Sequence, residues 1–220
     1  MRMDPELTID IVSDVVCPWC YIGKKRLEIA LDMLPQEIRP RLVWHPFQLD
    51  PTIPPGGLDR RQYMARKFGS PQKVRELHRP IERIGKDLGI DFDFEAIEVA
   101  PNTLDAHRLL RWAGQAGAQM QHRLAGLLFA AYFEQGADVG DARVLTEAAR
   151  TAGMDGERVA DLLATDADRA EVVEEIGHAQ RMGVTGVPCY ILNRRMAIMG
   201  ARDPETIAEA LLAACRDPDA

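Results

Sequence analysis

The sequence predicts an α/β fold with a large all-helical insertion, and three observations lead to this prediction. The N-terminal part has a strand, a helix and a second strand; a long block with only helical periodicity follows; strand character then returns before a final helix. A chain of 220 residues is long enough to bury a core without disulfide crosslinks. We expect one α/β domain formed by residues 1–57 and 166–220, with residues 58–165 as an inserted helical subdomain.

The N-terminal unit has a βαβ pattern. Residues 7–12 alternate apolar and polar side chains, which is typical of a strand. Apolar residues then recur at helical spacing as far as Leu34, and Pro35 ends that helix. Residues 41–49 have strand character again, and a helix between two strands favours parallel pairing. The Pro- and Gly-rich residues 50–57 mark the end of this unit.

The middle of the chain, from Arg60 to about Thr165, shows only helical periodicity. The elements expected after it are a helix over 169–182, a strand over 187–192, a tight reversal at 193–195, a strand over 196–199 and a last helix that Asp203 caps and Pro204 opens.

The composition excludes several classes of protein. With 46% hydrophobic and 28% charged residues, the chain resembles ordinary globular proteins. Its 27 basic and 34 acidic side chains give a net charge of −7, which disfavours nucleic acids and anionic membrane surfaces as partners. We see no export signal in residues 1–6 and no apolar run long enough to span a bilayer, so we expect a cytoplasmic protein.

The Cys17-Pro18-Trp19-Cys20 motif is the strongest chemical signal. Two cysteines three residues apart lie on one face of a helix, close enough to form a disulfide. Cys17 falls at the helix N-terminus, where unpaired N–H groups and the helix dipole favour its thiolate. Cys20 lies one turn further in and should keep its proton longer. We therefore predict that Cys17 is the nucleophile and Cys20 the resolving thiol.

An alternative is that these two cysteines form half of a zinc or iron–sulfur site. Such a site needs two more ligands, usually a second close pair. The remaining cysteines, Cys189 and Cys215, are 26 residues apart and fall in different elements. We therefore expect no metal and no tightly bound cofactor, with a metal-binding or chaperone module as the non-enzymatic alternative.

Val187-Pro188 begins the third expected strand and follows a flexible, Gly-containing loop. A cis peptide bond here would leave the Val187 backbone free to pair with an extended substrate. On base rates, however, an ordinary trans proline at the start of a strand is favoured, because only about 5–6% of X-Pro bonds are cis.

Together, these features resemble the thioredoxin superfamily in its DsbA-like arrangement, over almost the whole chain. The closest resemblance is to the cytoplasmic FrnE-like dithiol-disulfide isomerases. It rests on four segments: SDVVCPWCYIG at 13–23, PFQL at 46–49, NTLDAHRL at 102–109 and GVTGVP at 183–188.

The resemblance implies a thioredoxin fold with an all-helical insertion, a redox pair made of Cys17 and Cys20, and a cis Pro188 that faces this pair. We expect the substrate to contact Pro18, Trp19, Val187 and Pro188. The activity implied is thiol–disulfide exchange on proteins or small molecules that carry thiols or disulfides. An apolar rim around the site and the helical insertion would suit a homodimer.

A second enzyme class shares this architecture. Kappa-class glutathione transferases and 2-hydroxychromene-2-carboxylate isomerases carry a serine where this chain has Cys17, and they generally lack the second cysteine. The shared scaffold implies a glutathione cleft near Val187, Pro188 and Asp203, with glutathione as a co-substrate. A glutathione-dependent transferase or isomerase is therefore the alternative function.

Other candidates have simpler explanations. Cys189 and Cys215 are expected to be small buried hydrophobic residues. His107 and Arg108 lie in an apolar helix, and we favour a hydrogen-bonded packing role for the histidine over a catalytic one. The run at 24–26, Lys-Lys-Arg, is expected to be a solvated helix face.

Overall fold

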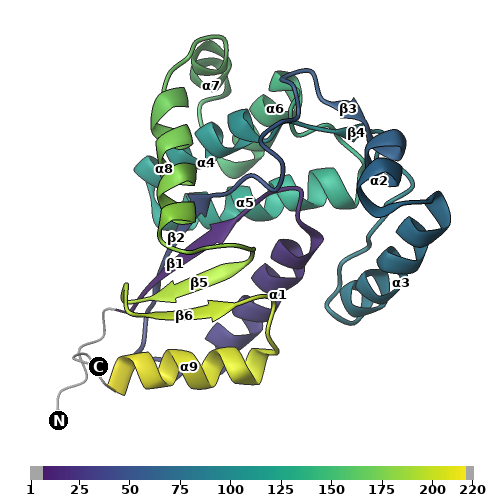
Figure 1. Ribbon diagram of the computed structural model, residues 1–220. Coiled ribbons are helices and arrows are strands. Elements are labelled where there is room, and N and C mark those ends of the chain that lie inside the picture. The colour runs from purple at the N-terminus through teal and green to yellow at the C-terminus, as the bar shows by residue number, and fades with distance from the viewer. Residues whose placement is uncertain (1–6, 217–220) are drawn as a thin grey trace.

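The computed structural model describes residues 7–216 and contains a four-stranded sheet surrounded by helices (Figure 1). The order along the sheet is β2-β1-β5-β6. The elements of this part are β1 (Thr8–Ser13), α1 (Pro18–Asp32), β2 (Arg41–Pro46), α8 (Arg169–Arg181), β5 (Cys189–Leu192), β6 (Met196–Met199) and α9 (Pro204–Arg216).

Strand β1 lies in the middle of the sheet and pairs on both sides. It runs parallel to β2, with Ile9 opposite Leu42, and antiparallel to β5, with Ile11 opposite Tyr190. The expected βαβ unit is therefore present, although β2 ends at Pro46 rather than at Leu49.

The hairpin formed by β5 and β6 has the predicted tight turn. Asn193 and Arg194 both adopt positive φ, at 49° and 59°, and the Arg195 N–H donates to the Leu192 carbonyl. The connection has three residues, 193–195, and the positive φ of its first two lets the chain reverse tightly. It brings β6 back onto β5, with Leu192 opposite Met196.

The inserted segment is mostly helical. Its elements are β3 (Leu58–Asp59), α2 (Arg60–Phe68), α3 (Pro71–Asp87), β4 (Val99–Ala100), α4 (Leu104–Ala116), α5 (Ala118–Phe133), α6 (Ala142–Ala152) and α7 (Gly156–Leu163). The expectation of helices alone from Arg60 onward was wrong at β4, which pairs antiparallel with β3. Two-residue strands are too short to produce a periodic pattern in the sequence.

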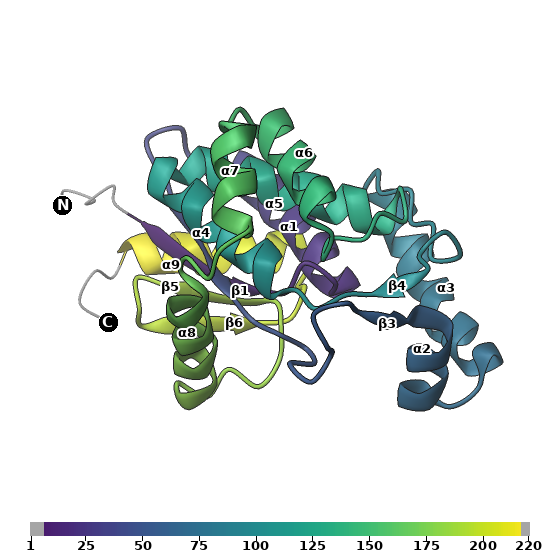
Figure 2. The same cartoon turned by 90° about the horizontal axis from the view of Figure 1, so that it is seen from above.

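The helices cover the sheet on both faces. Helices α1 and α9 pack against each other on one face, and α8 lies on the other face and contacts α4 (Figures 1 and 2). Helices α4 and α5 of the insertion pack directly on β2, and buried side chains from both parts form one continuous core. The division at residues 57/58 and 165/166 thus describes the order of elements, not two separate cores.

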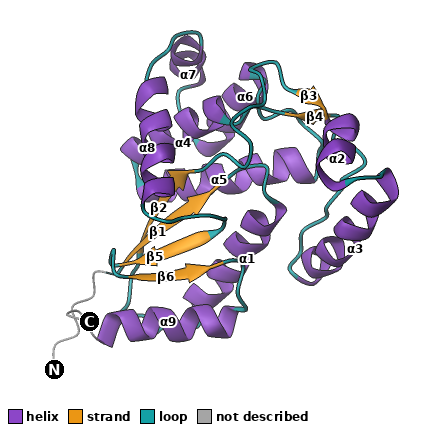
Figure 3. Ribbon diagram, in the orientation of Figure 1, coloured by secondary structure: helices purple, strands orange, loops and turns teal. Residues whose placement is uncertain are grey.

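Helices α2 and α3 form an arm that projects from the body beside the N-terminal end of α1 (Figures 2 and 3). The side chains of Asp59 and Ser70 accept hydrogen bonds from the first turns of these two helices. The Arg60 N–H donates to the Glu98 carbonyl, which fixes the start of α2 beside β4. No helix among residues 7–216 is both long and apolar enough to cross a membrane.

One expectation about the surface was wrong. Lys24 is buried, not solvated, because α1 packs there against α5 at Gly126, where an added Cβ would lie 3.1 Å from the Lys24 side chain. The Lys24 ammonium donates to Glu28 at 2.5 Å, and burial lowers the pKa of Lys24. Arg26 also has partners: it donates to the Ala201 carbonyl and pairs with Asp203.

Candidate active site

Cys17 is the N-cap residue of α1, directly before the first helical residue. It has extended backbone angles, φ −95° and ψ 113°, and Pro18 takes the first helical position. The Cys17 N–H donates to the Asp14 carbonyl at 3.0 Å, so the turn between β1 and α1 is tight. Its side chain therefore lies where the unpaired N–H groups and the dipole of the helix favour negative charge.

Cys20 lies one turn further along the same helix. It comes within 3.5 Å of Cys17, and both are free thiols. Burial, together with the neighbouring Cys17 side chain, raises the pKa of Cys20 well above its ordinary value. Cys20 thus holds its proton strongly, and the two thiols are close enough to join in a disulfide.

A loop from the other end of the chain closes over Cys17. The Val187–Pro188 peptide bond is cis, as the resemblance implies, rather than trans as the base rate favours. The Cys17 Sγ lies 3.8 Å from the Val187 carbonyl oxygen and donates to it, although 170 residues separate the two in sequence. The structure therefore brings the motif and the proline loop together.

An apolar cleft of about 520 Å³ opens at Cys17, between the motif and the α2–α3 arm. The expected site residues Cys17, Pro18, Trp19 and Val187 line it. Cys20 and Pro188 do not; Cys20 is buried behind Cys17, and Pro188 packs against α1. The arm contributes the apolar side chains of Tyr63, Met64, Phe68, Leu77 and Ile81.

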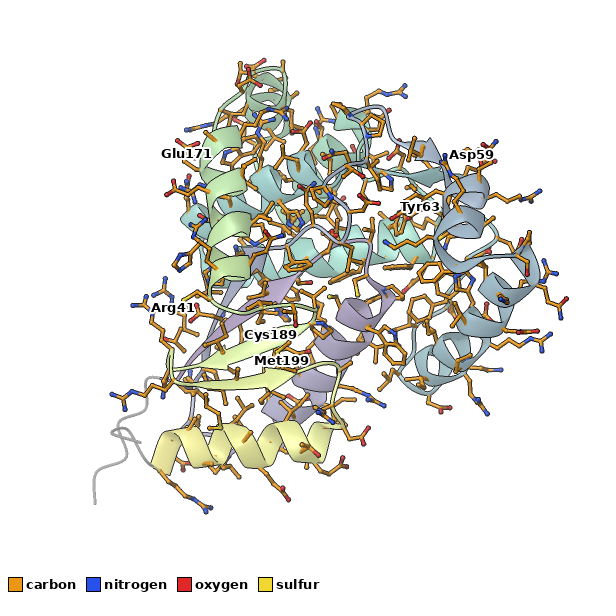
Figure 4. All side chains as sticks on the ribbon, in the orientation of Figure 1. Arg41, Asp59, Tyr63, Glu171, Cys189 and Met199 are labelled. Carbon is orange, nitrogen blue, oxygen red and sulfur yellow. The ribbon has the colours of Figure 1, made fainter. Side chains whose placement is uncertain are left out.

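The cleft also has polar residues, mostly from the arm. The Tyr63 hydroxyl donates to Asp50 at 3.0 Å and accepts from the Lys67 ammonium at 2.8 Å. Burial and the Asp50 carboxylate raise the pKa of Tyr63. Figure 4 shows Tyr63 on the side of α2 that faces the body of the molecule, with Asp59 at the start of that helix. None of these cleft residues from α2 and α3 was predicted from the sequence, because no motif or periodicity indicates that residues 60–81 lie beside Cys17.

The remaining candidates lie away from the cleft. Cys189, in β5 (Figure 4), is buried in a small apolar cluster with Val12 and Phe47, and Cys215 is buried on α9. Burial raises the pKa of both thiols. Neither lines the cleft, and nor does Asp203.

His107 and Arg108 are buried and hydrogen-bonded. The His107 Nε2 lies 2.8 Å from the Phe47 carbonyl oxygen and 3.4 Å from Asp14 Oδ1. The Arg108 guanidinium donates to the carbonyl of Leu162 at the end of α7 and to the carbonyls of Thr165 and Ala167 in the segment between α7 and α8. These contacts fit packing roles rather than roles at the cysteines.

Comparison with known proteins agrees with this geometry. A model of the DSBA-like thioredoxin domain matches residues 8–212. Among curated proteins, the uncharacterized YwbO of Bacillus subtilis is 26% identical, with 92% of this chain and 94% of that protein covered.

Solved structures are similar as well. The probable DsbA oxidoreductase SCO1869 from Streptomyces coelicolor is 30% identical, with a TM-score of 0.86 over 94% of this chain and 89% of that one. The cytosolic disulfide reductase DsbM from Pseudomonas aeruginosa, solved with glutathione, shares the fold at 18% identity, with a TM-score of 0.62 over 95% and 99% of the two chains.

These matches confirm the resemblance to the DsbA-like thioredoxin superfamily and the fold: this is an α/β thioredoxin fold with a helical insertion. They also support a general oxidoreductase or isomerase role. The chain belongs to the family of DSBA-like thioredoxin domains.

Proposed function

We propose that this protein exchanges disulfides with its substrates through Cys17 and Cys20. The observation that carries the proposal is the position of Cys17: it begins a helix, lies within 3.5 Å of a second thiol, and opens onto an apolar cleft beside the Val187 carbonyl. This arrangement provides an attacking sulfur, a resolving sulfur and a place for the substrate.

The reaction has two steps. First, the Cys17 thiolate attacks one sulfur of a substrate disulfide, forms a mixed disulfide and releases the other sulfur as a thiolate. Second, the Cys20 thiol gives its proton to the departing sulfur and attacks the Cys17 sulfur. The Cys17–Cys20 disulfide forms, and the substrate has been released as one thiol and one thiolate, which takes its proton from water. The substrate gains two electrons and the protein loses two.

The raised pKa of Cys20 gives the order of events. A thiol that keeps its proton does not compete with Cys17 for the substrate, because the thiolate is the nucleophile. It reacts only after the mixed disulfide has formed next to it. The reverse reaction, which oxidises a dithiol, uses the same two residues.

We further propose that the substrates are protein or small-molecule disulfides and that glutathione returns the pair to its reduced form. An isomerase role of the FrnE-like type needs the same chemistry in both directions. A reducing compartment such as the cytoplasm fits the four free cysteines.

A trapping experiment tests the mechanism. The Cys20→Ala protein, reacted with a model disulfide, is expected to accumulate a mixed disulfide at Cys17 that peptide mass spectrometry locates. Cys215→Ala, which removes another buried thiol far from the cleft, serves as the matched control and should accumulate none.

The outcome that contradicts the mechanism is Cys20→Ala protein that reacts without an adduct at Cys17. Turnover that survives Cys20→Ala, together with saturable glutathione binding, would instead indicate a glutathione-dependent transferase or isomerase.

A further inference from the structure

We propose that the cleft beside Cys17 selects small disulfides whose apolar body carries a carboxylate or a similar anion, and that Arg60 binds this anion. The inference rests on the proposed function and adds the class of substrate. It is carried by a buried cation in an apolar cleft.

Arg60 is the first residue of α2 and is only 9% exposed, yet it lines the cleft. Its Nη1 donates to the Phe94 carbonyl at 3.2 Å, and its guanidinium lies 5.8 Å from the centre of the Phe94 ring. Within residues 7–216 it forms no ion pair.

A buried guanidinium has five N–H donors and keeps its charge, so burial without a carboxylate is unfavourable. Asp59, Glu95 and Glu98 line a second cavity that Arg60 also lines, but none of them forms an ion pair with Arg60 within residues 7–216. The Asp59 side chain instead accepts from the Gln62 N–H. The Tyr132 hydroxyl is a further, uncharged neighbour of Arg60. An anion that enters the cleft would give the guanidinium a charged partner through charge-assisted hydrogen bonds.

The other charges of the cleft favour an anion too. Lys67 is a second cation, and the only carboxylate among the cleft residues, Asp50, already accepts from Tyr63 and Thr52. His78 is neutral at pH 7, because burial and the nearby Arg60 lower its pKa to about 4. The cleft is thus cationic on a chain whose net charge is −7.

The shape of the site points to a small molecule. Cys17 is only 4% exposed and lies inside a cleft of about 520 Å³, a size that suits ligands of drug-like mass. Trp19, at 39% exposure, lies at the opening. An aromatic disulfide matches both the volume and the mostly apolar lining of this cleft.

A pair of matched substrates tests the charge preference. Bis(4-carboxyphenyl) disulfide is anionic, and bis(4-carbamoylphenyl) disulfide is its neutral counterpart. The kcat/KM for each is measured and divided by its rate with dithiothreitol, which removes the difference in intrinsic reactivity. The wild-type protein is expected to prefer the anion by about tenfold to a hundredfold, the range of one charge-assisted hydrogen bond.

Variants of Arg60 then test whether this side chain causes the preference for the anionic substrate. Arg60→Gln should bring the ratio close to one, and Arg60→Lys should keep part of it. Arg61→Gln removes the same charge from the next, exposed residue and should leave the ratio unchanged. Because both substrates are measured on one sample, a partly unfolded fraction affects both rates equally and cancels in the ratio.

An anion-to-amide ratio of normalised kcat/KM that is the same in Arg60→Gln and wild type would overturn the inference. A higher normalised kcat/KM for a peptide disulfide than for the anionic disulfide would overturn it too.

A binding measurement distinguishes failure of this inference from failure of the exchange chemistry. Calorimetry on Cys17→Ala protein compares 4-phenylbutanoate with its amide, neither of which contains sulfur. Tighter binding of the acid, lost in the Cys17→Ala/Arg60→Gln protein, supports the inference even if no disulfide reacts.

Discussion

Gly23 of α1 lies against the ring of Pro188, so closely that a Cβ on residue 23 would be 2.9 Å from the proline Cγ. The same Cβ would also clash with the Tyr190 hydroxyl. Since the Val187 carbonyl faces Cys17 from the residue before that proline, this contact sets the distance between the loop and the redox pair.

We expect Gly23→Ala to slow disulfide exchange and to lower the free energy of unfolding by about 1–3 kcal/mol, the usual cost of overpacking a core. The added methyl group pushes the proline loop away from the start of α1. Urea unfolding and the rate with a model disulfide measure the two effects. Gly177→Ala is the matched control, because its Cβ would meet only the flexible end of Arg181. If Gly23→Ala had the stability and exchange rate of the wild type, the proline loop would be able to shift without affecting either the fold or the redox pair.

Tyr190→Phe provides a second test of this contact. The Tyr190 hydroxyl is buried and has no hydrogen-bond partner among the described residues, so its removal should leave the stability equal or higher. In the Gly23→Ala background it also removes one of the two clashing groups. We therefore expect the double variant to unfold at a higher urea concentration than Gly23→Ala alone.

The four thiols should differ in their reaction with iodoacetamide. Burial raises the pKa of Cys20, Cys189 and Cys215, whereas Cys17 begins a helix and lines the cleft. We expect Cys17 to be alkylated first at every pH between about 6 and 8. Peptide mass spectrometry over time measures the order. Labelling of Cys20 before Cys17 would reverse the assignment of nucleophile and resolving thiol.

His78 should make the protein sensitive to mild acid. Burial, with a contribution from Arg60, lowers its pKa from 6.5 to about 4. The unfolded chain then binds a proton more readily than the folded one, so stability falls as the pH drops from 6.5 to 4, by at most about 3 kcal/mol. His78→Gln should lack this loss. Urea unfolding at pH 7, 5.5 and 4.5 compares the two proteins.

Glu28 supplies a control in a lower pH window. Its burial would raise the pKa, but hydrogen bonds from His122 and Lys24 outweigh that effect and lower it to about 2. The stability that Glu28 contributes is present above pH 4.5 and is lost as the pH falls towards 2. Glu28→Gln should therefore leave the slope between pH 6.5 and 4.5 unchanged. An equal change of slope in both variants would mean that His78 is not the group responsible.

Arg108→Lys should be strongly destabilising although it preserves the charge. The guanidinium is fully buried and donates to the carbonyls of Leu162, Thr165 and Ala167, bonds that hold the end of α7 and the segment after it. One ammonium group cannot reach three separated acceptors. We expect a loss of about 3 kcal/mol or more in urea unfolding.

The exposed Arg150 offers the matched comparison, because Arg150→Lys should change the stability by less than about 0.5 kcal/mol. Similar values for the two substitutions would mean that the buried hydrogen bonds of Arg108 contribute little.

The parts of the fold that were predictable are those with local signals. The alternation of residues 7–12, the helix from the motif onward and the turn at Asn193 each depend on residues close in sequence. The start of α1 at Pro18 follows in the same way from the fixed φ of proline.

The cleft was not predictable, because it depends on where the arm packs. Arg60 and Tyr63 have no local feature that brings them to Cys17; the pairing of β3 with β4 and the contact of α3 with α1 do so. Lys24 was misplaced for a similar reason, since its burial depends on the packing of α1 against Gly126 of α5, about 100 residues further along the chain. The cis state of Pro188 came from family resemblance and not from the residues alone.

The contact between Cys17 and Val187 joins residues that are made at very different times. At 5–20 residues per second, a ribosome needs roughly 10 to 30 s to add the 170 residues between them. During that interval the nascent chain carries both thiols of the motif without the loop that covers them. The cover over the redox pair is therefore completed late in synthesis, after Val187 has been added to the chain.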